Sequence, residues 1–135
     1  MEKELRISNN VNEIATLANF IEELGEELSL SAETTMNINL ALEEAVANVI
    51  MYAYPPKEEQ SILLKVTSNE DQLIFLLTDK GVSFDPTQAE DVDLTLSIEE
   101  RPIGGLGIFL IRSIMNEVTY QRLDDENRLL MKKHI

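Results

Sequence analysis

Cysteine is absent from this 135-residue sequence, and histidine occurs once, at His134. Without cysteine the chain can form neither a disulfide framework nor a reactive thiolate, which fits a reducing compartment. Zinc sites are built from several cysteine and histidine side chains, so a single histidine argues against zinc as well. The sequence therefore excludes disulfide scaffolds and thiol chemistry, and it gives no support to a zinc site.

Basic residues are scarce: 11 Lys and Arg stand against 25 Asp and Glu, for a net charge of −14. Nucleic-acid binding depends on basic side chains that neutralise phosphates, so direct nucleic-acid contact is not expected. An anionic membrane surface is disfavoured for the same reason. An anionic ligand such as a nucleotide would need a divalent cation and local dipoles to offset this charge. The charge also permits a basic protein partner, although acidic surfaces often serve solubility alone.

Long apolar runs are missing too, since no stretch approaches the roughly 18 residues that a membrane-spanning helix needs. The first residues, MEKELRIS, are charged and contain no hydrophobic signal region. We therefore expect a cytoplasmic protein without membrane contact. The length and the apolar content of 44% are ordinary for one globular domain, which we predict to span residues 1–135.

Hydrophobic spacing predicts a strand and two helices in the N-terminal part. Apolar and polar residues alternate at 5–7, as in an edge strand. Asn10 offers an N-cap with a glutamate three residues later, which predicts that an amphipathic helix follows. Ser29 or Ser31 then begins a second helix. That helix ends at Pro55-Pro56, because proline cannot continue it.

The second half of the sequence predicts strands around one helix. Apolar alternation at 62–66 and 73–77 predicts a β-hairpin, whose second strand is expected to be buried on both faces. Over most of its length the stretch 80–103 shows neither the helical nor the strand spacing of apolar residues, which is typical of a lid or binding loop. Helical spacing resumes at Leu106, and two strands joined by a turn at 124–127 follow. This order predicts an α+β two-layer sandwich.

The stretch 40–54, LALEEAVANVIMYAY, is apolar on nearly all sides of a helix, so we expect it to be buried. It nonetheless carries Glu43, Glu44 and Asn48, and buried carboxylates or amides need partners. Glu44 and Asn48 are four residues apart and project from one face, with Tyr52 extending the row. Either this face is a polar stripe toward solvent, or it lines a cavity that offers a carboxylate base and an amide oxygen for a metal.

Four of the five glycines lie at the two ends of the long loop. Gly81 comes shortly after Asp79 at the end of a hydrophobic strand, and GGLG at 104–107 leads into a helix. Such a glycine-rich turn can bind phosphate through backbone N–H groups and the helix dipole. A simple hinge or tight turn is the alternative. Asp79 is either a turn former or a carboxylate that accepts a hydrogen bond from an exocyclic amine.

The sequence resembles the GHKL (Bergerat-fold) ATPases in three motifs that match their N, G1 and G2 boxes: EAVAN at 44–48, DKG at 79–81 with FDP at 84–86, and GGLG at 104–107. The short chain, the glutamate four residues before the asparagine, and the continuation GGLGIFLI are most similar to the anti-sigma-factor serine/threonine kinases. The resemblance covers essentially the whole chain. It implies a histidine-kinase-like ATPase fold, with a mixed, mostly antiparallel sheet covered by helices.

The resemblance also implies ATP and Mg²⁺ as cofactors. Asn48 would bind the Mg²⁺ that bridges the phosphates, Asp79 would accept a hydrogen bond from the adenine amine, and Gly81 would let the ring sit close. The last motif would bind the phosphates through Gly104, Gly105, Leu106 and Gly107. Residues from about 85 to 103 would form the ATP lid.

By the same resemblance, Glu44 would be the general base that takes the proton from an attacking serine hydroxyl, a role worth about 10²–10⁴-fold in rate. Glu43 is adjacent but lies about 100° round the helix, which favours Glu44 as the base. Tyr52 departs from the family pattern, because many members have histidine there. Arg101 and Lys80 are candidates for a cation near the γ-phosphate.

The function implied is that of a Mg-ATP-dependent serine kinase that binds a sigma factor and phosphorylates a STAS-type anti-sigma-factor antagonist. It would act as a homodimer in a partner-switching pathway of transcription regulation. Two alternatives stay open. One is a nucleotide-gated binding module without transfer activity, and the other is a weak ATPase or a detached sensor-kinase ATP module. The latter lacks a phosphoacceptor-helix histidine in this sequence, because His134 lies at the tail.

Overall fold

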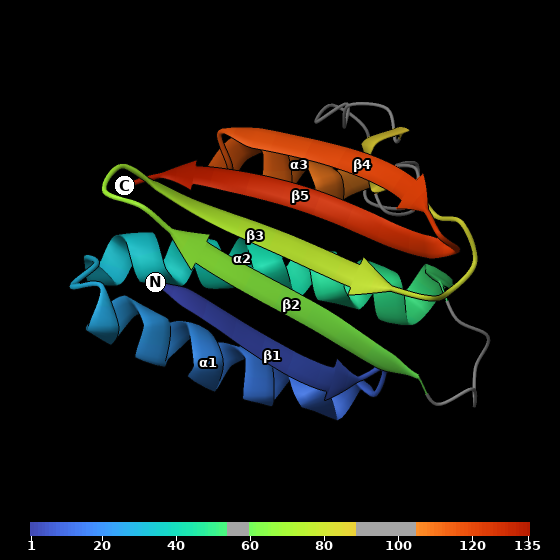
Figure 1. The fold of residues 1–135 in the computed structure, drawn as a ribbon, viewed down its shortest axis with the longest axis horizontal. Coiled ribbons are helices and arrows are strands. Elements are labelled where there is room, and N and C mark those ends of the chain that lie inside the picture. The colour runs from blue at the N-terminus through green and yellow to red at the C-terminus, as the bar shows by residue number, and fades with distance from the viewer. Residues whose placement is uncertain (54–59, 89–104) are drawn as a thin grey trace.

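The structure is a computed structural model in which residues 1–53, 60–88 and 105–135 are described. Five strands form one sheet in the order β1-β2-β3-β5-β4 (Figure 1). Their bounds are β1 (Glu2–Ser8), β2 (Ser61–Ser68), β3 (Gln72–Asp79), β4 (Glu117–Leu123) and β5 (Glu126–His134). All four neighbouring pairs are antiparallel. The described sheet is therefore antiparallel throughout, where a mixed, mostly antiparallel sheet was expected.

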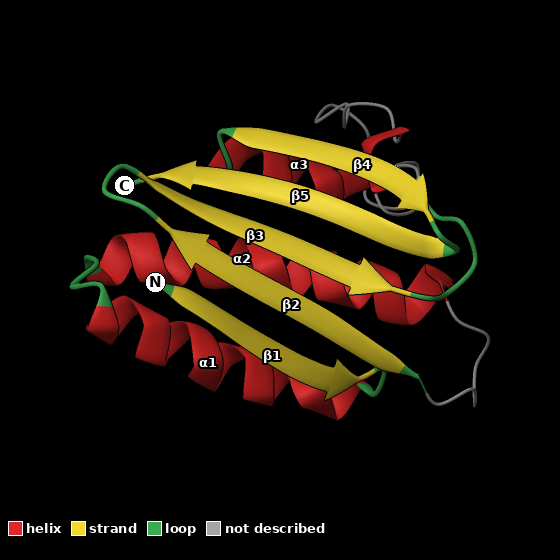
Figure 2. Ribbon diagram, viewed as in Figure 1, coloured by secondary structure: helices red, strands yellow, loops and turns green. Residues whose placement is uncertain are grey.

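Three helices cover one face of this sheet and lie behind it in Figure 2. They are α1 (Ile14–Glu27), α2 (Ala32–Asn48) and α3 (Gly105–Ile114). Short turns accompany them: a 3-10 turn at Val11–Glu13, a π-helical turn at Val49–Ala53 that continues α2, and a 3-10 turn at Pro86–Gln88. The predicted α+β two-layer sandwich is confirmed, and so is the predicted order of its elements.

Capping decides where the helices begin. The Ser31 hydroxyl oxygen accepts a hydrogen bond from the Thr34 N–H at 3.1 Å, so Ser31 rather than Ser29 is the N-cap of α2. Ser29 has a φ of 54° in the link between α1 and α2. At the start of the first helical segment, the Asn10 side-chain oxygen Oδ1 accepts a hydrogen bond from the Asn12 N–H at 2.9 Å. Asn10 is thus an N-cap, as its sequence context predicted.

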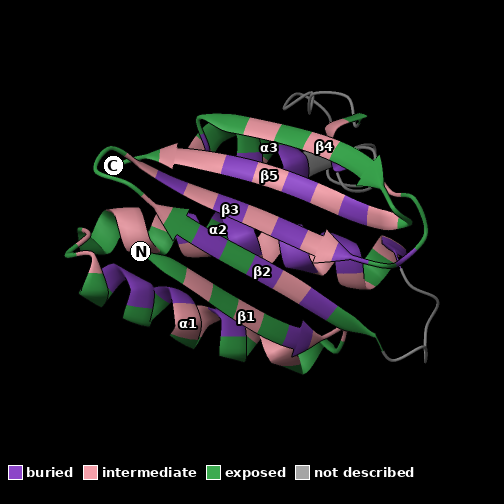
Figure 3. Cartoon of the chain, in the orientation of Figure 1, coloured by how far each residue is buried: buried purple, intermediate pink, exposed green. Residues whose placement is uncertain are grey.

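Burial alternates along the strands, because only the face toward the helices is covered (Figure 3). In β3, Leu73, Phe75 and Leu77 are buried, whereas Ile74 and Leu76 are only half-buried. The prediction that this strand is buried on both faces is therefore wrong. Its outward apolar side chains lie on a sheet face that no described helix covers.

The central helix is less buried than its composition suggested. α2 packs against α1, α3 and the sheet, and Leu42, Ala45 and Val46 are fully or almost fully buried. Leu40, however, is 39% exposed, and Met51 in the π-helical turn is 64% exposed. One side of the helix therefore faces outward, and the prediction of burial on all sides is wrong.

The β4–β5 hairpin fixes the register that matters for the site. Asp124 and Asp125 have φ values of 54° and 60°, the positive φ at both central residues that a type I′ turn requires. This turn pairs Arg122 with Asn127 across the hairpin. On its other side β5 pairs with β3, and this register places Asn127 opposite Asp79, the last residue of β3. Two polar residues far apart in sequence are thereby brought together.

Candidate nucleotide and phosphoryl-transfer site

Helices α2 and α3 meet at Gly107, in the first turn of α3. A Cβ added at Gly107 would lie 3.1 Å from Glu44 Oε2 and 3.5 Å from Asn48 Nδ2. The structure thus brings the glycine motif into contact with the carboxylate and amide of α2, although some 60 residues separate them in the sequence. The polar face of α2 lines the start of α3, and only a residue without a side chain leaves both groups in place.

Asn48 is buried, at 6% exposure, although its side chain is polar. Its Nδ2 is shielded from solvent and donates to no described residue. Buried polar groups are nearly always hydrogen-bonded, so such an atom marks a position where a ligand can supply the partner. Asn48 therefore points to a ligand at the junction of α2 and α3.

Asp79 ends β3 and is 3% exposed. Its Oδ1 accepts two hydrogen bonds, from the Gly81 N–H at 2.9 Å and from Asn127 Nδ2 at 2.9 Å. Burial raises the pKa of the Asp79 carboxyl above its ordinary value of 3.8, and these two bonds and the Arg122 charge oppose the rise. Among the described residues no bond reaches Oδ2, which leaves that oxygen as an acceptor for a ligand.

Asn127 connects the residues around Asp79 through its side-chain hydrogen bonds, and it was not predicted from the sequence as a site residue. It is 4% exposed, and its Nδ2 donates to the Val82 carbonyl at 2.8 Å as well as to Asp79. Its Oδ1 accepts from the Phe84 N–H at 3.2 Å, from the Tyr120 hydroxyl, and from Arg122 Nη1 at 3.2 Å. The amide is saturated, so Asn127 orients its neighbours instead of binding a ligand itself.

Gly81 is held on both sides of its peptide. Arg122 Nη1 donates to the Gly81 carbonyl at 2.7 Å, and the Val82 N–H donates to the Ala53 carbonyl at 2.7 Å. A Cβ at Gly81 would lie 2.3 Å from the Ala53 carbonyl oxygen, which is backbone and cannot give way. The structure thus explains this glycine by close packing on the end of the π-helical turn. The expected contact with an adenine ring stays a prediction.

The beginning of the predicted lid is anchored. Asp85 Oδ1 accepts from the Thr87 N–H at 2.8 Å and from its hydroxyl at 2.5 Å. Arg112 of α3 donates from Nη2 to the Thr87 carbonyl at 2.6 Å. Residues 89–103 of the lid lie outside the described part of the chain, as do Gly104 and the candidate cation Arg101.

The space beside Asp79 is small. Asn48, Asp79, Phe84 and Asn127 are among the residues around a cavity of about 20 Å³, room for about one water molecule. The Tyr52 and Phe84 rings are stacked, and their centroids are 5.1 Å apart. This cavity is smaller than an adenine ring, and Phe84 is among the residues that enclose it.

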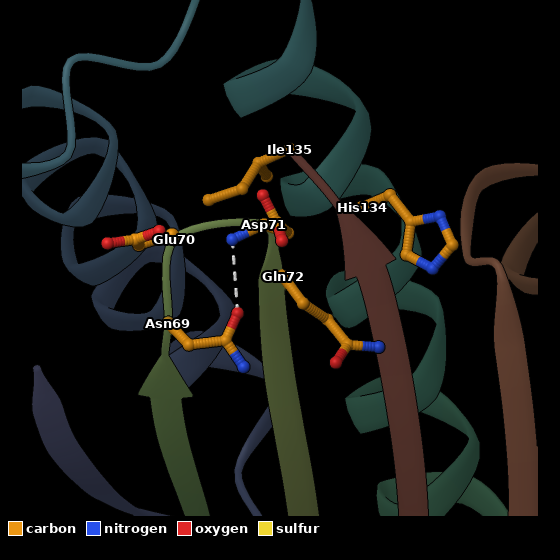
Figure 4. Close-up of a pocket in the computed structure, with 6 residues that line it drawn as sticks. All are labelled: Asn69, Glu70, Asp71, Gln72, His134 and Ile135. Carbon is orange, nitrogen blue, oxygen red and sulfur yellow. Dashed lines mark hydrogen bonds between the residues drawn. The ribbon is translucent and has the colours of Figure 1, made fainter.

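A larger hollow, of about 610 Å³, lies at the opposite end of β3 from Asp79. Figure 4 shows it between the β2–β3 turn and the end of β5, where the Asn69 side chain accepts a hydrogen bond from the Asp71 N–H at 3.1 Å. His134 and Ile135 border it. None of the residues of the three motifs is among those that line it. Size alone is therefore a poor guide to the site in this molecule.

Lys80, the other candidate cation, borders a separate hollow of about 310 Å³ together with Arg6, Ser61 and Thr78. Arg6 and Thr78 belong to the face of the sheet that the helices leave uncovered. Asn48 and Gly107 lie on the helical side. The structure thus places Lys80 apart from the Glu44–Asn48–Gly107 junction.

Comparison with known proteins assigns the family. The model of the histidine kinase-like ATPase domain matches residues 7–133. The chain belongs to this family. It is 31% identical over 104 residues to the serine/threonine-protein kinase BtrW of Bordetella bronchiseptica, an alignment that covers 77% of this chain and 73% of BtrW. The resemblance to the GHKL ATPases and their anti-sigma-factor kinases is confirmed, and a protein kinase is confirmed at the level of the family.

Two further relatives are serine-protein kinases named RsbW. The protein from Listeria monocytogenes is 29% identical over 116 residues, covering 83% of this chain and 73% of its own length. The protein from Bacillus cereus is 24% identical over 136 residues, covering 98% of this chain and 84% of its own length. The relatives therefore match the chain over most of its length.

A solved structure supports the fold. The histidine kinase domain of the blue-light activated histidine kinase from Erythrobacter litoralis superposes with a TM-score of 0.55 at 16% identity. The match covers 89% of this chain and 59% of that structure's chain. Within the described residues, no helix is both long and apolar enough to cross a bilayer.

Proposed function

We propose that this protein is a Mg-ATP-dependent serine kinase that acts as an anti-sigma factor. The observation that carries the proposal is the convergence of Glu44 and Asn48 on Gly107. A carboxylate, an amide and the first turn of a helix meet there within one contact distance. Phosphoryl transfer needs mainly positioning and charge neutralisation, and these three elements supply both.

The described residues fit a nucleotide with its metal. Asp79 Oδ2 would accept a hydrogen bond from the adenine amine, because Oδ1 already accepts hydrogen bonds from Gly81 and Asn127. Asn48 would offer its amide oxygen to Mg²⁺, which prefers oxygen ligands and keeps several waters, and its Nδ2 would donate to a phosphate oxygen. The bound nucleotide would supply the phosphoryl group, and the metal would supply neutralising charge.

Glu44 would act as the general base. Its Oε2 lies beside Gly107, at the end of α3 whose dipole favours the phosphates, so an acceptor hydroxyl placed against these phosphates would be within its reach. Glu43 is half-buried like Glu44 but projects about 100° away. It is therefore the natural comparison residue for the role.

The partners follow from the family resemblance. The protein would bind a sigma factor, phosphorylate a serine of a STAS-type antagonist, and act as a homodimer in the cytoplasm. The net charge of −14 fits protein partners and not nucleic acid. A nucleotide-gated binding module without transfer would share every binding step, and only the role of Glu44 separates the two.

The nucleotide assignment is tested with Asn48→Ala, by measuring ATP affinity with and without Mg²⁺. We expect the variant to lose the Mg²⁺-dependent part of the affinity. Asn39→Ala is the matched control, because Asn39 also lies on α2 with a buried side-chain atom that lacks a partner in the described residues. Unchanged Mg²⁺-dependent affinity in Asn48→Ala would refute the assignment.

A further inference from the structure

Helices α1 and α2 lie side by side (Figure 1). A groove of about 490 Å³ lies between them, and it is lined by none of the residues of the candidate nucleotide site. One wall is a stripe of α1 that runs from Ala18 to Glu26 at helical spacing. The other wall is a stripe of α2 from Ala32 to Asn39, and the link between the helices closes one end. From residue 18 to residue 26 the helix rises about 12 Å, so the groove matches two to three turns of an occupant helix.

The helices can form this groove because they approach closely at its closed end. Gly25 of α1 faces Thr35 of α2, and a Cβ at Gly25 would lie 2.4 Å from the Thr35 hydroxyl oxygen. The floor is apolar, with Ile21 buried and Leu30 half-buried. Met36 stands on the rim and is 58% exposed. An apolar floor with an exposed apolar rim is typical of a surface that binds a partner.

The charged side chains of the groove are both acidic. Glu22 and Glu26 are exposed on one rim, four residues apart, where two like charges repel each other. No lysine or arginine is among the residues that line the groove. Asn39 Oδ1 is buried and accepts no hydrogen bond from any described residue. Two negative charges and a buried acceptor thus surround one apolar floor, and each would gain from a donor.

We propose that this groove binds a basic amphipathic helix of a partner protein. Its apolar side chains would cover Ile21 and Met36, and its lysine or arginine side chains would pair with Glu22 and Glu26. A donor from the same helix would reach Asn39 Oδ1. This is the helix-in-groove mode, in which apolar anchors give affinity and charged groups give orientation.

Charge favours this occupant over the others. A second copy of the chain carries a net charge of −14 and would bring further acids to an acidic rim. A nucleic acid is excluded by the same sign of charge. A small apolar molecule would leave the two carboxylates and the Asn39 oxygen without partners. The inference does not rest on the kinase assignment, because Glu44, Asn48 and Asp79 do not line the groove.

The test uses synthetic peptides of about 16 residues, long enough to form a helix. One carries leucines at positions i, i+3, i+4 and i+7 with lysines elsewhere, and the second replaces every lysine by glutamate. Binding is measured by fluorescence anisotropy at physiological salt. We expect the lysine peptide to bind and the glutamate peptide not to bind. Equal binding of both peptides would overturn the proposal, because it would show an apolar surface without charge selection.

Charge reversal locates the binding. In the double variant Glu22→Lys/Glu26→Lys, the lysine peptide should bind about tenfold more weakly or worse, as a rise in Kd. Glu2→Lys/Glu70→Lys is the matched control, because it changes the net charge equally at exposed positions that do not line the groove. We expect less than about a twofold effect from the control. Equal weakening by both variants would overturn the proposal, since binding would then follow net charge alone.

A third variant tests the apolar contact without changing charge. Met36→Ser lies on the exposed rim and should weaken the lysine peptide while the circular dichroism spectrum stays unchanged. Unaltered binding in Met36→Ser would contradict docking in the groove. Asp79→Asn should bind the lysine peptide like the wild type, so loss of the nucleotide site and failure of the groove are separately visible.

Discussion

Asn127 donates from Nδ2 to Asp79 Oδ1 at 2.9 Å, across a register pair of β3 and β5. The bond joins residues that are 48 positions apart and that are both almost completely buried. It holds the carboxylate in one orientation, with Oδ1 engaged and no described residue donating to Oδ2. Asp79 is thereby preorganised as an acceptor, because a saturated neighbour fixes it before any ligand arrives.

The first prediction concerns Asp79→Asn. Burial raises the pKa of Asp79 in the folded protein, so the ionised carboxylate destabilises the fold at neutral pH. The amide keeps an oxygen to accept from Gly81 and Asn127 but loses the charge. We therefore expect the variant to be at least as stable as the wild type at neutral pH, by thermal unfolding, and to lose ATP affinity because an amide NH₂ would face the adenine amine.

The pH dependence gives the sign of this effect. A raised folded-state pKa means that the stability from the protonated carboxyl is fully present below the unfolded-state value and is lost as pH rises through the folded-state value. The stability advantage of Asp79→Asn should therefore shrink as pH is lowered through the folded-state pKa of Asp79. A variant that is clearly less stable than wild type at neutral pH would show that hydrogen bonding, not burial, dominates this carboxylate.

The second prediction concerns Asn127→Ala. The substitution removes five hydrogen bonds and leaves the Val82 carbonyl, the Phe84 N–H and Asp79 with fewer partners. A buried group left unsatisfied costs about 1–3 kcal/mol, so we expect a loss of at least that size in the free energy of unfolding, measured in urea. Nucleotide affinity should fall with it, because Asp79 loses its orientation.

Asn116→Ala is the control for this loss. Asn116 is exposed and accepts one side-chain hydrogen bond, from the His134 N–H at 2.8 Å. Its removal should cost no more than about 1 kcal/mol. Equal losses in the two variants would mean that the Asn127 network contributes nothing beyond a single surface bond.

The third prediction concerns Gly107→Ala. The added Cβ would lie 3.1 Å from Glu44 Oε2, at the end of a flexible side chain that can move by a few tenths of an ångström. Alanine also favours a helix over glycine by about 1 kcal/mol, so we expect stability to change by no more than that. Phosphoryl transfer should fall at least about tenfold, because the displaced carboxylate is no longer aligned.

Ser113→Ala serves as the comparison on the same helix. Ser113 is exposed on α3 and bonds to the Leu110 carbonyl at 2.8 Å, away from Glu44. We expect its transfer rate to match the wild type. If Gly107→Ala also keeps the wild-type rate at unchanged stability, the contact between Gly107 and Glu44 has no catalytic consequence.

Much of the fold could be predicted, because the spacing of apolar residues and the helix-capping residues are local features of the sequence. Alternation predicted the strands of the β2–β3 hairpin, and Ser31 marked the start of α2. The helix end predicted at Pro55-Pro56 lies outside the described residues. The outward face of β3 could not be predicted, since Ile74 and Leu76 read as core while only one layer of helices exists. The exposure of Leu40 and Met51 could not be predicted either, because composition does not say which side of a helix packs against a neighbour.

The site could be predicted in part. The motifs carried Glu44, Asn48, Asp79 and Gly107, and the structure brings the first, second and fourth into contact. Asn127 escaped notice because its role arises from strand register, and a lone asparagine after a turn reads as a turn former. The register argument could have found it: an antiparallel hairpin that follows the last helix places some residue opposite the strand-ending aspartate.

The most direct test of the central claim compares Glu44→Gln with Glu43→Gln. Each purified protein receives γ-labelled ATP and Mg²⁺ together with a lysate of its own host, and labelled proteins are separated by size. We expect wild type and Glu43→Gln to label one small protein, and Glu44→Gln to lose the label while binding ATP with unchanged affinity. Equal labelling by Glu44→Gln and wild type, or no labelling by any of them with ATP bound, would contradict a kinase that uses Glu44 as its base.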